Sequence, residues 1–169
     1  MNEEIKECNW SKDKIIELAE KVAEVAEIDP IEQPDFSEVV KIFGGSVELN
    51  TVSFLTDSIE VKAKFDFKIK LDPSATKERQ RFTMAHELGH YFLHSKQGQI
   101  PINAFRSGSN LAEQEANFFA ANILMPKRLF SAKYKSLSKK TQLEKETEMA
   151  NLFHVSVPAI RARCAFLGL

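Results

Sequence analysis

Residues 84–94 read Met84-Ala85-His86-Glu87-Leu88-Gly89-His90-Tyr91-Phe92-Leu93-His94 and hold three of the chain's four histidines. The centre of this stretch is H-E-x-x-H, the pattern with which a helix presents two imidazoles and a carboxylate to a zinc ion. Residues four apart lie on one helix face, about 6 Å apart along the axis, so His86 and His90 can bind one metal. Glu87 is rotated by about 100° from His86, which removes it from the ligands but leaves it able to contact a water on the metal. The motif predicts a zinc hydrolase.

A hydrolytic zinc site needs a third protein ligand, and the candidates are His94, Glu113 and Glu115. On a continuous helix His94 lies about 12 Å from His86, beyond the reach of one ion, so we expect it at the helix end in contact with a ligand. Glu113 follows Asn110 by three residues, as in a capping box, which gives it a local role at a helix start. Glu115 borders an apolar face, where a carboxylate needs a compensating partner. Helical periodicity leaves both carboxylates open, and the capping pattern favours Glu115.

Other residues near the motif have simpler expected roles. Gly89 is expected to let a neighbouring segment approach the metal helix closely. Arg79 and Arg81 are expected to be solvated at the helix start, although they could also orient an acidic group or the substrate. Tyr91 is rotated away from the ligand face, and Tyr134 is a candidate for stabilising an oxyanion.

Hydrophobic periodicity predicts an α+β order of elements. Helices are expected at residues 11–27, with Ser11 as N-cap, and at 36–43, followed by a strand through Val47, Leu49, Val52 and Phe54. The strict alternation from Val61 to Leu71 predicts one half-buried strand. Ser74 or Thr76 then opens the metal helix, residues 95–109 resemble a loop, and further helices are expected at 111–124, 127–131, 139–153 and 157–166.

Composition and charge are those of an ordinary globular chain of 169 residues. Because there is no run of about 18 apolar residues and the N-terminus is acidic, we expect a cytoplasmic protein. Cys8 and Cys164 stand at opposite ends and are expected to be free thiols. Residues 1–60 hold 5 basic and 15 acidic side chains, whereas residues 127–169 hold 9 basic and 3 acidic ones. This asymmetry fits an anionic partner such as nucleic acid, but intramolecular complementarity or a solvated face is the favoured interpretation.

Two blocks of sequence closely resemble the ImmA/IrrE family of metallopeptidases. The family signatures are R-F-T-x-A-H-E-x-G-H and E-A-N-x-F-A-x-x-L-L-M-P. Here residues 79–90 read R-Q-R-F-T-M-A-H-E-L-G-H, and residues 113–126 read E-Q-E-A-N-F-F-A-A-N-I-L-M-P. Ile123 is a mild departure, since leucine is common there, and residues 155–169 also resemble family members.

The resemblance implies zinc ligands at His86, His90 and Glu115, with Glu87 as the catalytic acid and base. The fold it implies is a small zincin-like metallopeptidase domain with N-terminal helices, a short antiparallel sheet, the two site helices and a C-terminal helical pair. We expect a single domain over residues 1–169, with N-terminal helices at 1–45, the strand and metal core at 46–126 and the C-terminal helices at 139–169.

For function, the resemblance implies a zinc-dependent endopeptidase that cleaves a helix-turn-helix transcriptional repressor, in a mobile element or a stress response. A zinc-binding antirepressor that acts by protein contact with little proteolysis is one alternative. A DNA-binding protein is another, because residues 150–163 fit A-x-x-F-x-V-S-x-x-A-I-x-x-R, which resembles a helix-turn-helix, with Arg161 and Arg163 on the second helix. We favour packing of this helical pair instead, since a recognition helix usually carries more polar groups. The expected core residues are Leu152, Phe153, Ile160, Phe166 and Leu167.

Overall fold

The computed structural model describes residues 5–32, 35–50, 57–105 and 110–169. The elements, in chain order, are α1 (Lys12–Val25), α2 (Ser37–Ile42), β1 (Gly45–Leu49), β2 (Ser58–Ala63), β3 (Asp66–Leu71), α3 (Lys77–Gly89), the π-helix η1 (His90–His94), β4 (Ile102–Phe105), α4 (Leu111–Leu124), α5 (Lys127–Ser136), α6 (Gln142–Phe153) and α7 (Val157–Leu167). The α+β class predicted from the sequence is confirmed.

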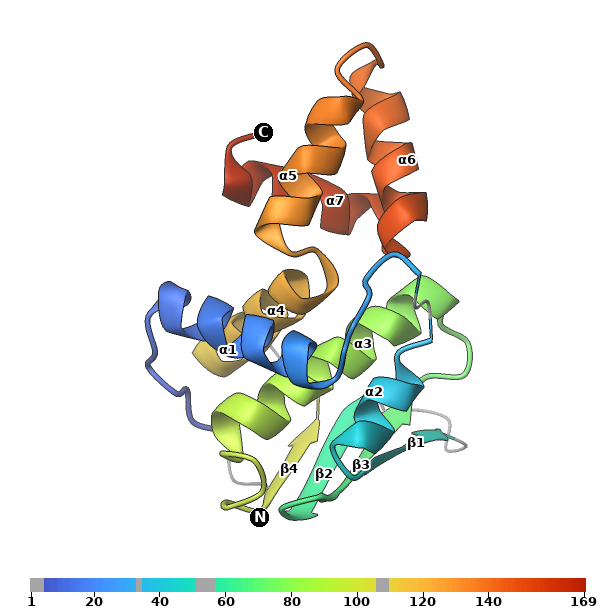
Figure 1. Cartoon of the computed structure of the whole chain (residues 1–169). Coiled ribbons are helices and arrows are strands. Elements are labelled where there is room, and N and C mark those ends of the chain that lie inside the picture. Colours follow the sequence, from blue (N-terminus) through green and yellow to red (C-terminus); the bar gives the residue numbers. More distant parts are fainter. Residues whose placement is uncertain (1–4, 33–34, 51–56, 106–109) are drawn as a thin grey trace.

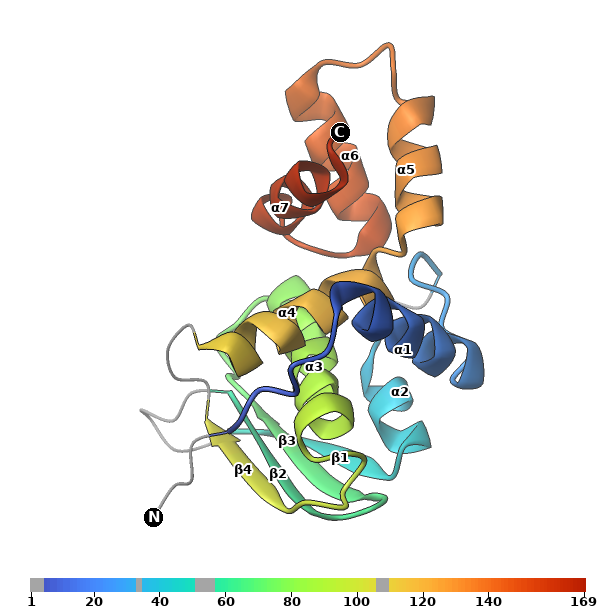
Figure 2. The same cartoon turned by 90° about the vertical axis from the view of Figure 1, so that its left-hand side faces the viewer.

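A four-stranded sheet forms the base of the molecule, with strand order β1-β3-β2-β4 (Figure 1). β2 pairs antiparallel with β3 and β4, but β1 runs parallel to β3, so the sheet is mixed rather than antiparallel as predicted. Helices α2 and α3 lie on one face of the sheet in both views (Figure 2). Helix α4 crosses over α3, and α1 packs against α4. The two helices that carry the histidines and the glutamates therefore pack directly against each other.

The alternating stretch from Val61 to Leu71 is a hairpin, and the prediction of one strand was wrong. β2 ends at Ala63 and β3 begins at Asp66, and Phe65 takes a positive φ of 61° between them. The inward positions of both strands are odd-numbered, because Val61 pairs with Phe67 and both are buried. The register shifts by one residue between Val61 and Ala63, so odd positions of β2 face odd positions of β3 and the alternation continues across the turn. Because the turn also lacks Gly, Asn and Pro, the sequence gives no sign of it.

Other strand predictions had mixed outcomes. Val47 and Leu49 lie in β1, whereas Val52 and Phe54 fall outside the described residues. β4 occupies part of the stretch that was expected to be a loop.

Helix starts follow the predicted capping residues. The Ser11 side chain accepts a hydrogen bond from the Lys14 N–H and opens α1, whose inward face buries Ile15, Ala19 and Val22. Thr76, rather than Ser74, caps α3 by accepting from the Arg79 N–H. The two caps fix the starts of α1, which packs against α4, and of α3, which lies on the sheet.

The last three helices form a C-terminal lobe (α5, α6 and α7) that stands beyond the end of α4 (Figures 1 and 2). α5 extends to Ser136, past the predicted short segment. Phe130, Phe153 and Ile160 are buried and belong to the same core cluster as the sheet and helices below. Phe166 was expected in this core but is 45 % exposed. The single-domain organisation over residues 1–169 stays a prediction.

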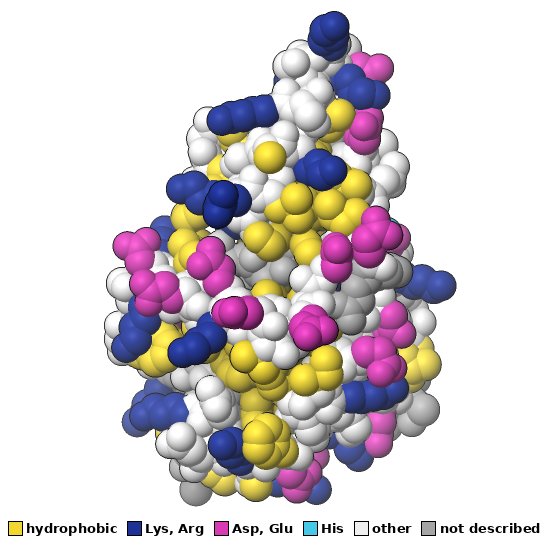
Figure 3. Space-filling model, in the orientation of Figure 1, with side chains coloured by type: hydrophobic (Ala, Val, Ile, Leu, Met, Phe, Trp, Pro, Cys, Tyr) yellow, Lys and Arg dark blue, Asp and Glu magenta, His cyan; other side chains and the backbone are white. Residues whose placement is uncertain are grey.

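Charge is distributed unevenly over the surface (Figure 3). Acidic side chains gather around α1, whereas Lys and Arg predominate over the C-terminal lobe. None of the helices in the described part of the chain combines the length and apolar character needed to cross a bilayer.

Candidate metal centre

Three buried side chains converge where α3 meets α4. His86 Nε2 lies 3.1 Å from His90 Nε2. The Glu113 carboxylate contacts both rings, with Oε2 3.2 Å from His86 Nε2 and Oε1 3.2 Å from His90 Nε2. His86 comes from α3, His90 begins η1, and Glu113 stands in the first turn of α4. The α3 helix, its π-helical continuation η1 and the α4 helix thus supply two imidazole nitrogens and one carboxylate to a single point.

The donor set and its spacing fit a zinc ion. His86 Nδ1 lies 3.0 Å from the Asn117 side-chain oxygen, which can only accept, so Nδ1 carries the proton and Nε2 presents a lone pair. Two imidazoles and one carboxylate are the protein ligands of many catalytic zinc sites, which keep a fourth position open. Ligand atoms around one tetrahedral ion stand about 3–4 Å apart, close to the distances found here.

The electrostatics of Glu113 also favour a cation at this point. Burial raises the pKa of Glu113, but hydrogen bonds with His86 and His90 outweigh burial and hold the pKa well below its usual value. Without a cation these three groups can approach one another only by sharing protons. A divalent ion would replace those protons and neutralise the buried carboxylate.

Glu115 does not join this group, and its expected place as third ligand is corrected. Its Oε2 lies 3.0 Å from His94 Nε2, and its carboxylate accepts the backbone N–H groups of Cys8 (2.8 Å) and Asn9 (3.1 Å). Positions two apart on a helix differ by about 200° in direction, so Glu113 and Glu115 point to different sides of α4. The face with Glu113 is the one turned toward the histidine pair.

The capping argument against Glu113 was only half right. Asn110 does cap α4, since its side-chain oxygen accepts the Glu113 N–H at 2.9 Å. That bond uses the backbone of Glu113 and leaves its carboxylate able to turn toward His86 and His90. Glu113 shares a helix face with Ala116, which meets Gly89 of α3, but the sequence alone does not show which face of α4 meets α3.

Gly89 permits the close approach of the two helices, as expected. A Cβ at this position would meet Cα of Ala116 at 3.1 Å and its carbonyl oxygen at 3.2 Å. The first turn of α4 can therefore lie against the end of α3, which brings Glu113 within reach of the histidines.

The π-helix determines where His94 lies. The Ser95 N–H donates to the His90 carbonyl, a bond over five residues, so the backbone widens after Gly89 instead of continuing as an α-helix. His94 Nδ1 then lies 3.0 Å from His90 Nδ1. Burial and the neighbouring His90 lower the pKa of His94, while Glu115 opposes this shift. His94 therefore contacts the His90 ring but is not one of the three converging side chains.

Glu87 is buried, with 1 % of its surface exposed, on the same turn of α3 as His86. Tyr91 points away from the site, because its hydroxyl accepts the Phe65 N–H and its ring stacks on Phe67. Tyr134 is not brought to the histidines: it lies in α5, where its hydroxyl donates to Gln142 and its ring stacks on Phe130. Its candidacy as an oxyanion stabiliser is corrected accordingly.

Arg81 is buried, contrary to the expectation of a solvated side chain. Its Nη2 donates to the Pro30 carbonyl at 3.0 Å, and its guanidinium lies over the Phe36 ring. Burial lowers the pKa of Arg81 to about 10, and the Asp35 carboxylate opposes this shift. Arg81 therefore ties the α1–α2 linker to α3, while Arg79 is exposed.

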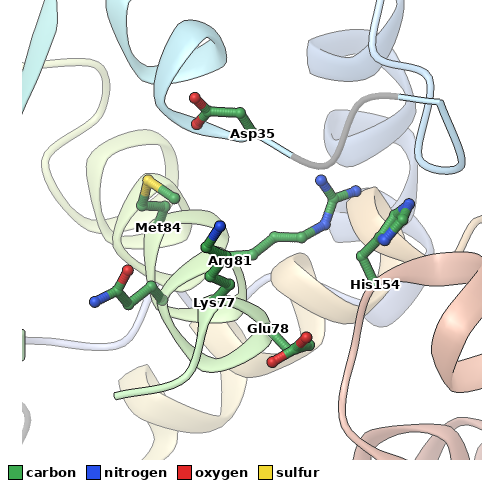
Figure 4. A pocket seen from close by; sticks show the side chains of 7 residues that line it. Asp35, Lys77, Glu78, Arg81, Met84 and His154 are labelled. Atoms are coloured by element: carbon green, nitrogen blue, oxygen red, sulfur yellow. The ribbon is translucent and has the colours of Figure 1, made fainter. Parts of the chain in front are cut away.

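A pocket of about 380 Å³ opens beside the N-terminal half of α3 (Figure 4). Arg81 points across it toward His154, and Asp35 lines the opposite side. The histidine pair and Glu113 are not among its lining residues. This pocket and the converging group are separate features of α3.

The two arginines proposed to contact DNA have partners within the protein. Arg163 is 2 % exposed and donates from Nε and Nη2 to the Met125 carbonyl and from Nη2 to the Asn122 side-chain oxygen. Arg163 is thus a structural residue, which agrees with the favoured interpretation of packing and not with the alternative of DNA contact. Arg161 is more exposed and pairs with Glu146 at 2.8 Å.

The fold is that of a small zincin-like domain, and its α3 and α4 region carries the converging His-His-Glu group. Residues 56–165 match the family model Peptidase_M78, described as the IrrE N-terminal-like domain, and the chain belongs to this family. The resemblance to ImmA/IrrE proteins is thereby confirmed. Members of this family are typically metal-dependent peptidases.

A solved structure of a Mycobacterium tuberculosis transcriptional regulator shares the fold, with a TM-score of 0.61 and 16 % sequence identity. The match covers 94 % of this chain and 48 % of the regulator, so the chain spans about half the length of that protein. No curated protein matches the sequence.

Proposed function

We propose that the protein is a zinc-dependent endopeptidase whose metal is held by His86, His90 and Glu113. The observation that carries this proposal is the convergence of two imidazole nitrogens and a carboxylate at 3.1–3.2 Å in a buried site, on the H-E-x-x-H helix of a peptidase family. Three buried electron-pair donors at one point are suited to binding a divalent cation.

Each residue of the site has a separate role. A bound zinc supplies Lewis acidity that polarises the scissile carbonyl and lowers the pKa of water. Asn117 holds His86 in the tautomer that directs Nε2 into the site. Glu87 accepts the proton of the attacking water as its oxygen bonds to the carbonyl carbon, then gives that proton to the amine as the C–N bond breaks.

The target we propose is a transcriptional repressor of the helix-turn-helix type, acting in the cytoplasm, whose cleavage would switch on a mobile element or a stress response. The peptidase family supports the reaction, and the structural neighbour is named as a transcriptional regulator. DNA contact through the C-terminal lobe has less support, because the Arg163 side chain is buried in hydrogen bonds to α4 and Met125.

The test is cleavage of a repressor encoded beside the gene, followed for Glu87→Gln and for a matched control. We expect Glu87→Gln to keep its zinc and to cleave at least about 100-fold more slowly, since it loses general acid–base catalysis. Glu78→Gln alters an exposed glutamate on the same helix and should cleave like the wild type. Cleavage by Glu87→Gln at the wild-type rate would contradict the mechanism. A zinc-loaded wild type that binds the repressor without cutting it would contradict the peptidase proposal and favour an antirepressor.

A further inference from the structure

A second group of metal-ligand side chains lies next to the first. Cys8, His94 and Glu115 each direct a ligand atom to a common point, and these atoms lie within 4.8 Å of one another. The three residues come from the segment before α1, from η1 and from α4. That N-terminal segment lies beside the C-terminal end of α3 in both views (Figures 1 and 2).

The group is fixed in place by its surroundings. The His94 side chain has no exposed surface, and its Nε2 lies 3.0 Å from Glu115 Oε2. The Glu115 carboxylate, 14 % exposed, also accepts the backbone N–H groups of Cys8 and Asn9. These two bonds hold the thiol of Cys8 against the imidazole and the carboxylate, at a place that remains partly open to solvent.

We propose that Cys8, His94 and Glu115 form a second metal site, for a thiophilic divalent cation such as zinc or cadmium. Thiolate, imidazole and carboxylate are all zinc ligands, at about 2.0–2.3 Å from the metal. Binding forms a metal–sulfur bond and releases the thiol proton to solvent. The cation would also offset the repulsion between a thiolate and the adjacent carboxylate.

A single hydrogen bond couples this site to the first one. This coupling rests on the proposed function, in which His90 is a zinc ligand. His90 Nδ1 and His94 Nδ1 lie 3.0 Å apart. Between two neutral rings, this hydrogen bond requires that one Nδ1 carries a proton and donates it, while the other Nδ1 accepts. When His90 presents its Nε2 lone pair to the first site, its Nδ1–H donates to His94. His94 then carries its proton on Nε2, donates it to Glu115 and cannot bind a metal there.

The opposite arrangement serves the second site. If His94 Nε2 binds a cation, His94 Nδ1 carries the proton and His90 must carry its own on Nε2. Filling both sites would bring two N–H groups face to face at 3.0 Å. The two sites therefore compete, and a cation on Cys8, His94 and Glu115 weakens binding at the first site.

Cobalt(II) tests this proposal, because a thiolate ligand gives it a sulfur-to-metal charge-transfer band. In the reduced 169-residue protein we expect Glu113→Gln, which weakens the first site, to bind cobalt with this band. Adding Cys8→Ser should abolish the band, whereas adding Cys164→Ser, which changes the buried cysteine of α7, should leave it. The zinc-loaded wild type should need a cobalt concentration about tenfold or more above that of Glu113→Gln to reach the same band intensity. His86→Gln provides a second weakened first site if Glu113→Gln folds poorly by circular dichroism.

Absence of the sulfur band in both weakened variants, or its survival in the Cys8→Ser background, would overturn the second site. An equal cobalt requirement in zinc-loaded wild type and Glu113→Gln would overturn the competition. The first site is tested separately by the zinc content of Cys8→Ser alone. If Cys8→Ser lost its zinc, the zinc of the wild type would lie at the second site, and this would count against the proposed function. The sulfur band of Glu113→Gln would be unaffected by that result, so the two proposals are tested independently.

Discussion

At the scale of single residues, two glutamates two positions apart on α4 have different partners. Glu113 faces His86 and His90, whereas Glu115 faces His94 and the Cys8 backbone. The histidine pair could be predicted because its spacing follows directly from the helix. The choice between the glutamates could not, since it depends on which face of α4 meets α3.

A residue-scale prediction concerns Asn117, whose side-chain oxygen lies 3.0 Å from His86 Nδ1. Asn117→Ala removes the group that fixes the His86 tautomer, so zinc affinity should fall by about 10–100-fold. Competition with a chromophoric chelator measures this affinity. Asn151→Ala, at an exposed position of α6, is the control and should bind zinc like the wild type. Equal affinity in the two variants would show that Asn117 does not orient His86.

At the scale of elements, helices could be predicted well from capping residues and periodicity, but strands less so. Ser11 and Asn110 marked the true starts of α1 and α4. The two turn residues, Lys64 and Phe65, are not among the residue types that usually signal a turn. The π-helical turn at residues 90–94 also has no sequence signal, because its H-Y-F-L-H residues suit an α-helix equally well.

An element-scale prediction concerns the crossing of α3 and α4 at Gly89. In an exposed helix, Gly→Ala stabilises by about 1 kcal/mol. Here the added Cβ would stand 3.1 Å from the Ala116 backbone, so overpacking should outweigh the gain and leave a net loss of about 1 kcal/mol. Urea unfolding of the metal-free protein measures this free energy. A more stable Gly89→Ala variant would show that the two helices can separate without cost.

At the scale of the whole molecule, one set of contacts joins the C-terminal lobe to the body. Arg163 of α7 donates to Met125 and Asn122 at the end of α4, and His154 lies 2.7 Å from the Ile31 carbonyl through its Nε2. The sequence predicted packing of these helices over DNA contact. It could not identify Arg163 as a packing residue, because a buried arginine and an exposed one look alike in sequence.

A prediction at this scale follows from the burial of Arg163. Arg163→Met keeps the volume but leaves the Met125 carbonyl without its charged donor, so stability should fall by about 2–3 kcal/mol. The control is Arg161→Ala, which breaks a more exposed ion pair and should cost less than about 1 kcal/mol. Thermal and urea unfolding measure both variants. Equal stability of the two would mean that Arg163 does not anchor the lobe.

The central claim is that His86, His90 and Glu113 hold the metal, and its most direct test is the zinc content of two matched glutamate variants. Both variants are made in a Cys8→Ser background, which removes the proposed second site. After dialysis against a weak chelator, Glu113→Gln should retain little zinc, because one of three ligands is lost. Glu115→Gln should keep close to stoichiometric zinc, since its carboxylate contacts His94 and Cys8 instead. Zinc loss from Glu115→Gln with retention by Glu113→Gln would contradict the account.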